Sequence, residues 1–195
     1  MTTRQHEEQL VGLTATRAAH SRQVARTVAD LAPQWVAPEH VDDVTTAALL
    51  HDVGYREDIA TTGFHPLDGA AHLAASGYSP LVCHLVATHT AAHLEAHVRG
   101  IPETDFAPYL LPQIDTSMER AVLTYADLTT LHTGQPCTVA QRLETILDRY
   151  DDGPVREYIT AHIDGLRAAG SAPDGLLSDA ARQLRVLPSE EKGTP

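Results

Sequence analysis

Apolar residues recur along this chain at steps of three and four, the spacing that places side chains on one face of an α-helix. Val24, Val28 and Leu31 form such a stripe within residues 9–31. His20 lies one turn before Val24 and therefore on the same face. Alternation of apolar and polar residues, which is typical of half-buried strands, does not stand out in any segment. The pattern predicts an all-α fold.

Proline and glycine mark the expected helix boundaries. Pro38 and Pro66 suit the first turn of a helix, where a residue without an N–H group loses no hydrogen bond. Gly54 follows an apolar helical segment, so we expect it to end that helix in the left-handed conformation. Residues 102–112 are expected to be irregular. The predicted helices are residues 9–31 with a break near Gly12, 41–51, 65–77, 80–98 continuing or restarting at Ala91, 116–131, 138–149, 154–168 and 176–187.

Length and composition agree with a helical domain. A chain of 195 residues is long enough for one domain with a substantial core. We expect residues 1–187 to form this domain, with C-terminal helices over 138–187, and residues 188–195 to be a disordered tail. Hydrophobic residues make up 43% of the chain but aromatic residues only 5%, which favours helices over strands.

The net charge and the cysteines indicate which binding partners and which cellular compartment to expect. The net charge of −12 makes the chain a poor candidate for broad binding to nucleic acid or to an anionic membrane. No stretch reaches the ~18 apolar residues of a membrane span, and the amino terminus lacks the apolar core of a signal peptide. Cys83 and Cys137 have no metal-type spacing. We therefore expect a cytoplasmic protein with two free thiols.

Histidines and aspartates interrupt the apolar stripes of several predicted helices. Neutral imidazole and carboxylate are good ligands for divalent metals, and a helical bundle can bring inward-facing side chains to one metal centre. Buried, such groups would be costly unless they were paired or bound to metal. Four of them predict a one-metal site, and two more histidines complete a set large enough for two metals. The four are His20, His51, Asp52 and Asp127, and the further two are His65 and His89.

The order and context of these residues resemble the HD superfamily of metal-dependent phosphohydrolases. The similarity spans residues 15–130 and rests on five ordered segments. The extra histidines resemble the ligands of its two-metal branches, but the Gly-Tyr-Pro signature of the HD-GYP phosphodiesterases is absent, so that substrate class is not implied. The segments are Ala19–Ala25, His51-Asp52-Val53-Gly54-Tyr55, His65-Pro66-Leu67-Asp68-Gly69, Val86-Ala87-Thr88-His89 and Tyr125-Ala126-Asp127.

The resemblance implies a function and assigns roles. The chain is expected to be an HD-type helical bundle that hydrolyses a small phosphomonoester or phosphodiester, such as a nucleotide, with one or two divalent ions (Mn, Fe, Co, Mg, Zn or Ni). Asp52 would bridge two metals and be the catalytic carboxylate. Arginine suits phosphate binding, and Arg17, one turn before His20, is the first candidate. Arg99 is the second, with Glu95 as its orienting or acid–base partner.

Other interpretations stay open. His65 and His89 can instead be a helix-start residue and a core histidine, with His84 as the substitute ligand for His89. Arg17 and Arg99 can simply pair with carboxylates. The same six-ligand set also resembles HD-type di-iron oxygenases, which use O₂ in place of water. A third alternative is a non-catalytic module that binds a nucleotide or a structural metal.

Overall fold

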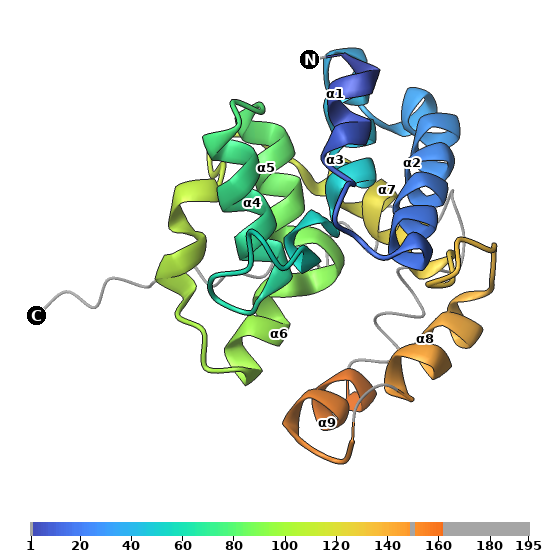
Figure 1. Cartoon of the computed structure of the whole chain (residues 1–195), viewed down its shortest axis with the longest axis vertical. Coiled ribbons are helices and arrows are strands. Elements are labelled where there is room, and N and C mark those ends of the chain that lie inside the picture. The colour runs from blue at the N-terminus through green and yellow to red at the C-terminus, as the bar shows by residue number, and fades with distance from the viewer. Residues whose placement is uncertain (1, 149–150, 162–195) are drawn as a thin grey trace, which may run out of the picture.

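A computed structural model describes residues 2–148 and 151–161 of the chain. These residues hold no strand, only isolated bridges between Val11 and Leu13 and between Thr130 and Pro136, so the prediction of an all-α fold is confirmed. The helical elements, with 3₁₀ turns labelled η, are α1 (Thr3–Glu8), α2 (Ala15–Trp35), η1 (Pro38–His40), α3 (Val41–Leu50), η2 (Val53–Tyr55), α4 (His65–Ala75), α5 (Pro80–Thr88), η3 (His89–Ala91), α6 (Ala92–Val98), η4 (Glu103–Tyr109), α7 (Ser117–Leu128), α8 (Val139–Leu147) and α9 (Pro154–Ala161) (Figure 1).

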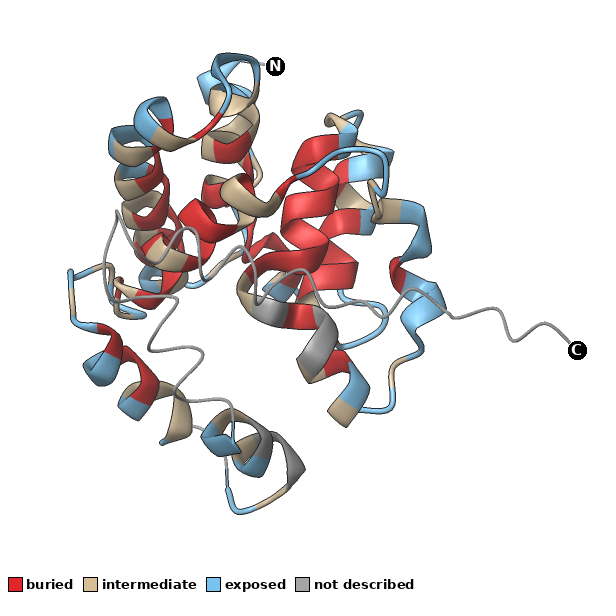
Figure 2. Ribbon diagram, turned by 180° about the vertical axis from the view of Figure 1, so that it is seen from behind, coloured by how far each residue is buried: buried red, intermediate tan, exposed pale blue. Residues whose placement is uncertain are grey.

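The core lies between two groups of helices that meet along α3 and α5. On one side α2 packs against α3 and α7, and on the other α4 packs against α5 (Figure 1). Figure 2 shows buried residues concentrated on the facing sides of these helices, while α8 and α9 project away from them. Val24 and Val28, which the sequence placed on one stripe, are both fully buried. Burying this apolar surface is the main stabilising contribution to the bundle.

The structure also bears on the two cysteines and on membrane-spanning helices. Cys83 and Cys137 are both free cysteines. Among the described residues, no helix combines the length and the apolar character needed to cross a membrane.

The structure differs from the helix predicted over residues 9–31 at both ends of that helix. A separate helix, α1, precedes the predicted start, and the break near Gly12 is confirmed by a φ of +101° at that residue. The main helix starts after Thr14, whose hydroxyl accepts a hydrogen bond from the Arg17 N–H at 3.3 Å. It also continues past residue 31 and through Pro33. Because proline has no N–H group, α2 lacks one backbone hydrogen bond at Pro33, and the neighbouring Ala32 is fully buried.

We expected Gly54 to end a helix in the left-handed conformation, and this expectation was wrong. This glycine is not among those with positive φ, and the chain continues past it in the 3₁₀ turn η2. A Cβ atom at this position would lie 2.0 Å from the carbonyl oxygen of His65 and 2.6 Å from the amide nitrogen of Gly69. Glycine is therefore required because η2 touches the backbone of α4, and this contact places residues 51–55 beside His65.

Two other boundaries also differ. Residues 103–109, expected to be irregular, form the 3₁₀ segment η4. The helix predicted over 116–131 is α7, which ends at Leu128, because Thr130 pairs with Pro136 in an isolated bridge. The expected helix over 176–187, the end of the helix over 154–168 and the tail over 188–195 lie outside the described residues.

His84 is held in the neutral form by its surroundings. Its Nδ1 lies 3.0 Å from the carbonyl oxygen of Tyr109, so Nδ1 must carry the proton. Its Nε2, 2.9 Å from the Thr116 hydroxyl, then accepts that hydrogen bond. Burial lowers the pKa of His84 to about 4. From the sequence, His84 was a structural residue and only a substitute metal ligand in place of His89. These contacts agree with the structural role.

This pKa predicts a pH-dependent stability. In the unfolded chain His84 takes up a proton below about pH 6.5, whereas the folded protein resists protonation down to about pH 4. The folded state therefore loses up to about 3 kcal/mol between those values. In His84→Gln, the amide donates to Tyr109 and accepts from Thr116 without titrating. The free energy of unfolding in urea, measured on metal-free protein, should fall more between pH 7 and pH 4 in the wild type than in His84→Gln, by the amount given above. Equal falls in the two proteins would contradict the lowered pKa of His84.

Candidate metal centre

Five of the six predicted ligands form two groups that share Asp52. We call His20, His51 and Asp52 the first ligand group, and Asp52, His65 and His89 the second ligand group. Within each group the potential ligand atoms all lie within 4.8 Å of one another. Helices α2, α3, α4 and α5, or the turns directly after them, supply these residues. Segments far apart in the sequence thus place their imidazoles around one buried carboxylate.

Asp127, the sixth predicted ligand, lies at the edge of the first ligand group. Its Oδ1 is 3.1 Å from His20 Nε2 and accepts a hydrogen bond from Arg142 Nη2 at 2.9 Å. Its Oδ2 accepts a hydrogen bond from the hydroxyl of Thr90. Thr90 has a φ of +46°, which is unfavourable for a β-branched residue. The backbone strain at the kink between α5 and α6 therefore falls on a residue that holds a candidate ligand.

Three of the histidines are oriented by the backbone in the same way. In His20, His51 and His89, Nδ1 lies against a carbonyl oxygen, which can only accept a hydrogen bond, so Nδ1 carries the proton. In the neutral ring, Nε2 is then left with a free lone pair, which is the usual state of a metal-binding histidine. The acceptors are the carbonyl oxygens of Leu131, Ala48 and Val86, at 3.0, 2.8 and 2.7 Å respectively.

Two pairs of candidate ligand atoms are already as far apart as two ligands of one cation would be. His65 Nε2 is 3.2 Å from His89 Nε2, and His20 Nε2 is 3.1 Å from Asp127 Oδ1. Two ligands of one metal at bond lengths near 2.1 Å lie roughly 3.0 to 3.4 Å apart, depending on geometry. His51 Nε2 is buried and has no hydrogen-bond partner among the described residues. A buried polar atom without a partner is costly, and a metal ion would satisfy it.

The charge states are those that metal binding needs. Burial is the largest influence on His51 and lowers its pKa to about 4, and burial likewise lowers the pKa of His65 well below 6.5. Burial would raise the pKa of Asp52, but His51 and Arg17 nearby lower it overall. Near pH 7 the two imidazoles are therefore neutral while the carboxylate is ionised, so no proton has to leave them before a metal binds.

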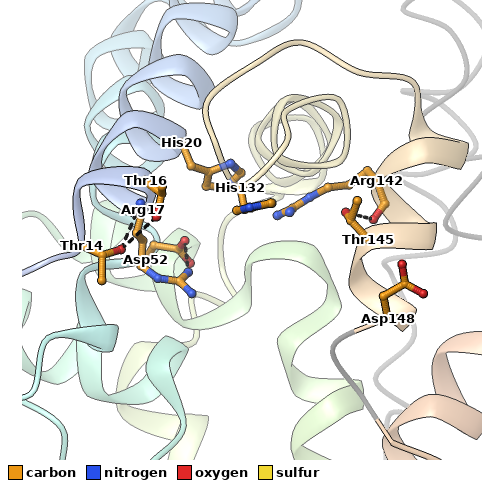
Figure 3. Close-up of a pocket in the computed structure, with 9 residues that line it drawn as sticks. All are labelled: Thr14, Thr16, Arg17, His20, Asp52, His132, Arg142, Thr145 and Asp148. Atoms are coloured by element: carbon orange, nitrogen blue, oxygen red, sulfur yellow. Dashed lines mark hydrogen bonds and ion pairs between the residues drawn. The ribbon is translucent and has the colours of Figure 1, made fainter.

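A cavity of about 500 Å³ opens beside the first ligand group. Figure 3 shows the residues that line it. This volume is within the usual range for small-molecule sites. The Arg17 guanidinium lies at one end, with Nη1 2.6 Å from Asp52 Oδ2, and Arg142 extends from α8 toward the centre. The lining residues are Thr14, Thr16, Arg17, His20, Asp52, His132, Arg142, Thr145 and Asp148.

The second arginine candidate is placed differently. Arg99 pairs with Glu95 one turn earlier, with Nε 2.8 Å from Oε1, and its guanidinium lies 5.9 Å from the centre of the Phe64 ring. Neither Arg99 nor Glu95 is among the residues that line the cavity beside Asp52. The structure thus brings Arg17, and not Arg99, into contact with the shared carboxylate.

Sequence reasoning missed two residues of the centre. Arg142 is only 7% exposed and binds Asp127. A signal for it existed, because Arg142 falls between Val139 and Leu143 on the buried stripe of α8, where an unpaired charge would be costly. For Thr90 the sequence offers no comparable signal, since its role depends on a backbone conformation that threonine rarely adopts.

Fold and site together define an all-α domain whose histidine and aspartate groups can hold divalent metal. A family model described as HD domain matches residues 17–152, well over half of the chain. The chain belongs to the HD domain family. No significant match is found among curated proteins or among solved structures.

Proposed function

We propose that this protein is a metal-dependent phosphohydrolase that cleaves a small phosphomonoester or phosphodiester, with Asp52 shared between two divalent ions. The observation that carries the proposal is the pair of ligand groups with one common carboxylate. Membership of the HD domain family supports the same class of reaction. Bound divalent ions would supply Lewis-acid activation of water and neutralise charge on the phosphoester.

The chain's own residues have separate roles in this proposal. The four histidines with Asp52 and Asp127 would hold the metals, and the backbone hydrogen bonds of His20, His51 and His89 fix the positions of their ligand atoms. Arg17 is the group we assign to the phosphate. The Arg17 guanidinium lines the adjoining cavity beside Asp52, so it is placed to pair with a substrate anion there. The size of that cavity favours a small substrate over a polymer.

Metal content and turnover test the proposal together. Protein purified without a tag should contain about two metal equivalents per chain by elemental analysis. It should hydrolyse some member of a panel of nucleoside monophosphates, p-nitrophenyl phosphate and bis-p-nitrophenyl phosphate. Treatment with EDTA should abolish turnover, and Mn²⁺ or Co²⁺ should restore it. Iron content with substrate-dependent O₂ uptake would move the protein to the oxygenase class, and two metals without any turnover would favour a binding module.

The two arginine candidates give a matched comparison. At saturating metal, Arg17→Gln should raise KM for the best substrate about tenfold or more, because a charge-assisted hydrogen bond to phosphate is lost. Arg99→Gln makes the same chemical change away from the cavity and should leave KM within about twofold. Equal effects of the two substitutions, or a larger effect of Arg99→Gln, would contradict the assignment of Arg17.

A further inference from the structure

Tyr55 lies between a candidate metal ligand and the proposed phosphate-binding residue. Its ring stacks on the ring of His65, with centroids 3.9 Å apart and an interplanar angle of 17°. The guanidinium carbon of Arg17 lies 3.4 Å from the centre of the same Tyr55 ring. Two groups this close to one ring centre cannot share a face, so His65 and Arg17 must occupy opposite faces of Tyr55.

Both neighbours of Tyr55 converge on the shared carboxylate. Arg17 Nη1 is 2.6 Å from Asp52 Oδ2, and His65 Nε2 is 3.5 Å from Asp52 Oδ1. The contacts Asp52–Arg17–Tyr55–His65–Asp52 thus form a closed ring of four side chains. Aromatic stacking and a cation over an aromatic face are both stabilising beyond the burial of apolar area, so each contact of Tyr55 favours the arrangement.

His65 depends on this stacking more than the other histidines of the centre do. His20, His51 and His89 are each anchored by a hydrogen bond from Nδ1 to a backbone carbonyl. In the part of the chain that the structure describes, His65 makes no such bond through Nδ1, and its side chain is 17% exposed. Beside the tilted rings of Phe64 and His89, the stacked face of Tyr55 is the closest ring contact that restricts the orientation of His65.

We propose that Tyr55 is a positioning residue that holds His65 for the second ligand group and Arg17 for the substrate anion. The inference rests on the proposed function. The Arg17 guanidinium has two separate contacts, one with Asp52 and one with the face of Tyr55. The contact with Tyr55 does not depend on the carboxylate, so it would keep the guanidinium at the cavity for a substrate anion. Gly54 makes the arrangement achievable by allowing η2 to approach the start of α4.

Calorimetric titration of the metal-free full chain with Mn²⁺ tests the inference without relying on turnover. Tyr55→Leu removes the aromatic face but retains an apolar side chain, and Tyr55→Phe keeps the face and removes only the hydroxyl. In Tyr55→Leu we expect one metal equivalent at wild-type affinity and the other weakened about 10- to 100-fold, the usual effect of losing a group that orients a ligand. In the metal-loaded protein, inorganic phosphate should bind at least fivefold more weakly. Tyr55→Phe should match the wild type in both measurements.

The outcomes separate this inference from the proposed function. Tyr55 is 44% exposed, so the melting temperature of Tyr55→Leu should change little and a folding defect is readily recognised. Wild-type affinities for both equivalents in Tyr55→Leu, or equal losses in Tyr55→Phe, would overturn the role of the ring. Fewer than two equivalents in the wild type would overturn it as well. Two bound metals and weakened Tyr55→Leu binding, without turnover on any substrate, would uphold the inference and contradict the hydrolase.

Discussion

Asp52→Asn will abolish binding of both metal equivalents and reduce turnover about a thousandfold or more. Asp52 is the one residue common to the two ligand groups. Its Oδ1 lies 3.6 Å from His51 Nε2 and 3.5 Å from His65 Nε2, so it faces ligands of both groups. Asparagine retains the shape but has no negative charge and only one acceptor oxygen. Losing the several kcal/mol of stabilisation that metal ions provide to a transition state corresponds to this reduction in rate.

Asp58→Asn provides the matched control. Asp58 is an exposed carboxylate paired with Arg56, so the same chemical change there should leave metal content and turnover at wild-type values. Elemental analysis and initial rates on both variants, with thermal melting to establish that each is folded, complete the comparison. Two equivalents of metal in folded Asp52→Asn would contradict the shared-ligand centre. Loss of only one equivalent would show that Asp52 belongs to a single metal site.

Gly54→Ala will damage both the stability of the bundle and the second ligand group. The added Cβ would lie 2.0 Å from the His65 carbonyl oxygen and 2.6 Å from the Gly69 nitrogen. Both are backbone atoms, so no side-chain rotation relieves the clash and the start of α4 must move. We expect the free energy of unfolding to fall by about 3 kcal/mol, the upper part of the range for overpacked sites. Because His65 starts α4, affinity for one metal equivalent should fall as well.

Gly153→Ala is the control for this substitution. The nearest atom to a Cβ at Gly153 is 3.9 Å away, which is ordinary contact, so the effect on stability should stay within about 0.5 kcal/mol. Denaturant unfolding and Mn²⁺ titration of the two variants make the comparison. If Gly54→Ala unfolds within 0.5 kcal/mol of the wild type, then η2 and α4 do not approach as closely as the structure indicates.

The helical class and most helix positions follow from the sequence because they depend on local patterns. The stripe through Val24 and Val28, the proline starts and the polar interruptions at His20 and Asp127 are all readable over a few turns of helix. The same patterns predicted a six-residue ligand set, and five of its members form the two ligand groups. The errors at Gly54 and at residues 103–109 arose where the chain packs against other helices: η2 against α4, and η4 against α4, α5 and α6.

What only the tertiary structure decided is the arrangement of side chains across helices. Sequence spacing could not choose between Arg17 and Arg99, because contact with Asp52 depends on how α2 packs against α3. Nor could it reveal that Tyr55 separates His65 from Arg17. Helix periodicity fixes which face of one helix is buried, whereas the meeting of two faces is set by packing between segments distant in the chain. The sequence by itself thus determined the fold class and the candidate ligands, and packing determined which of them share a carboxylate.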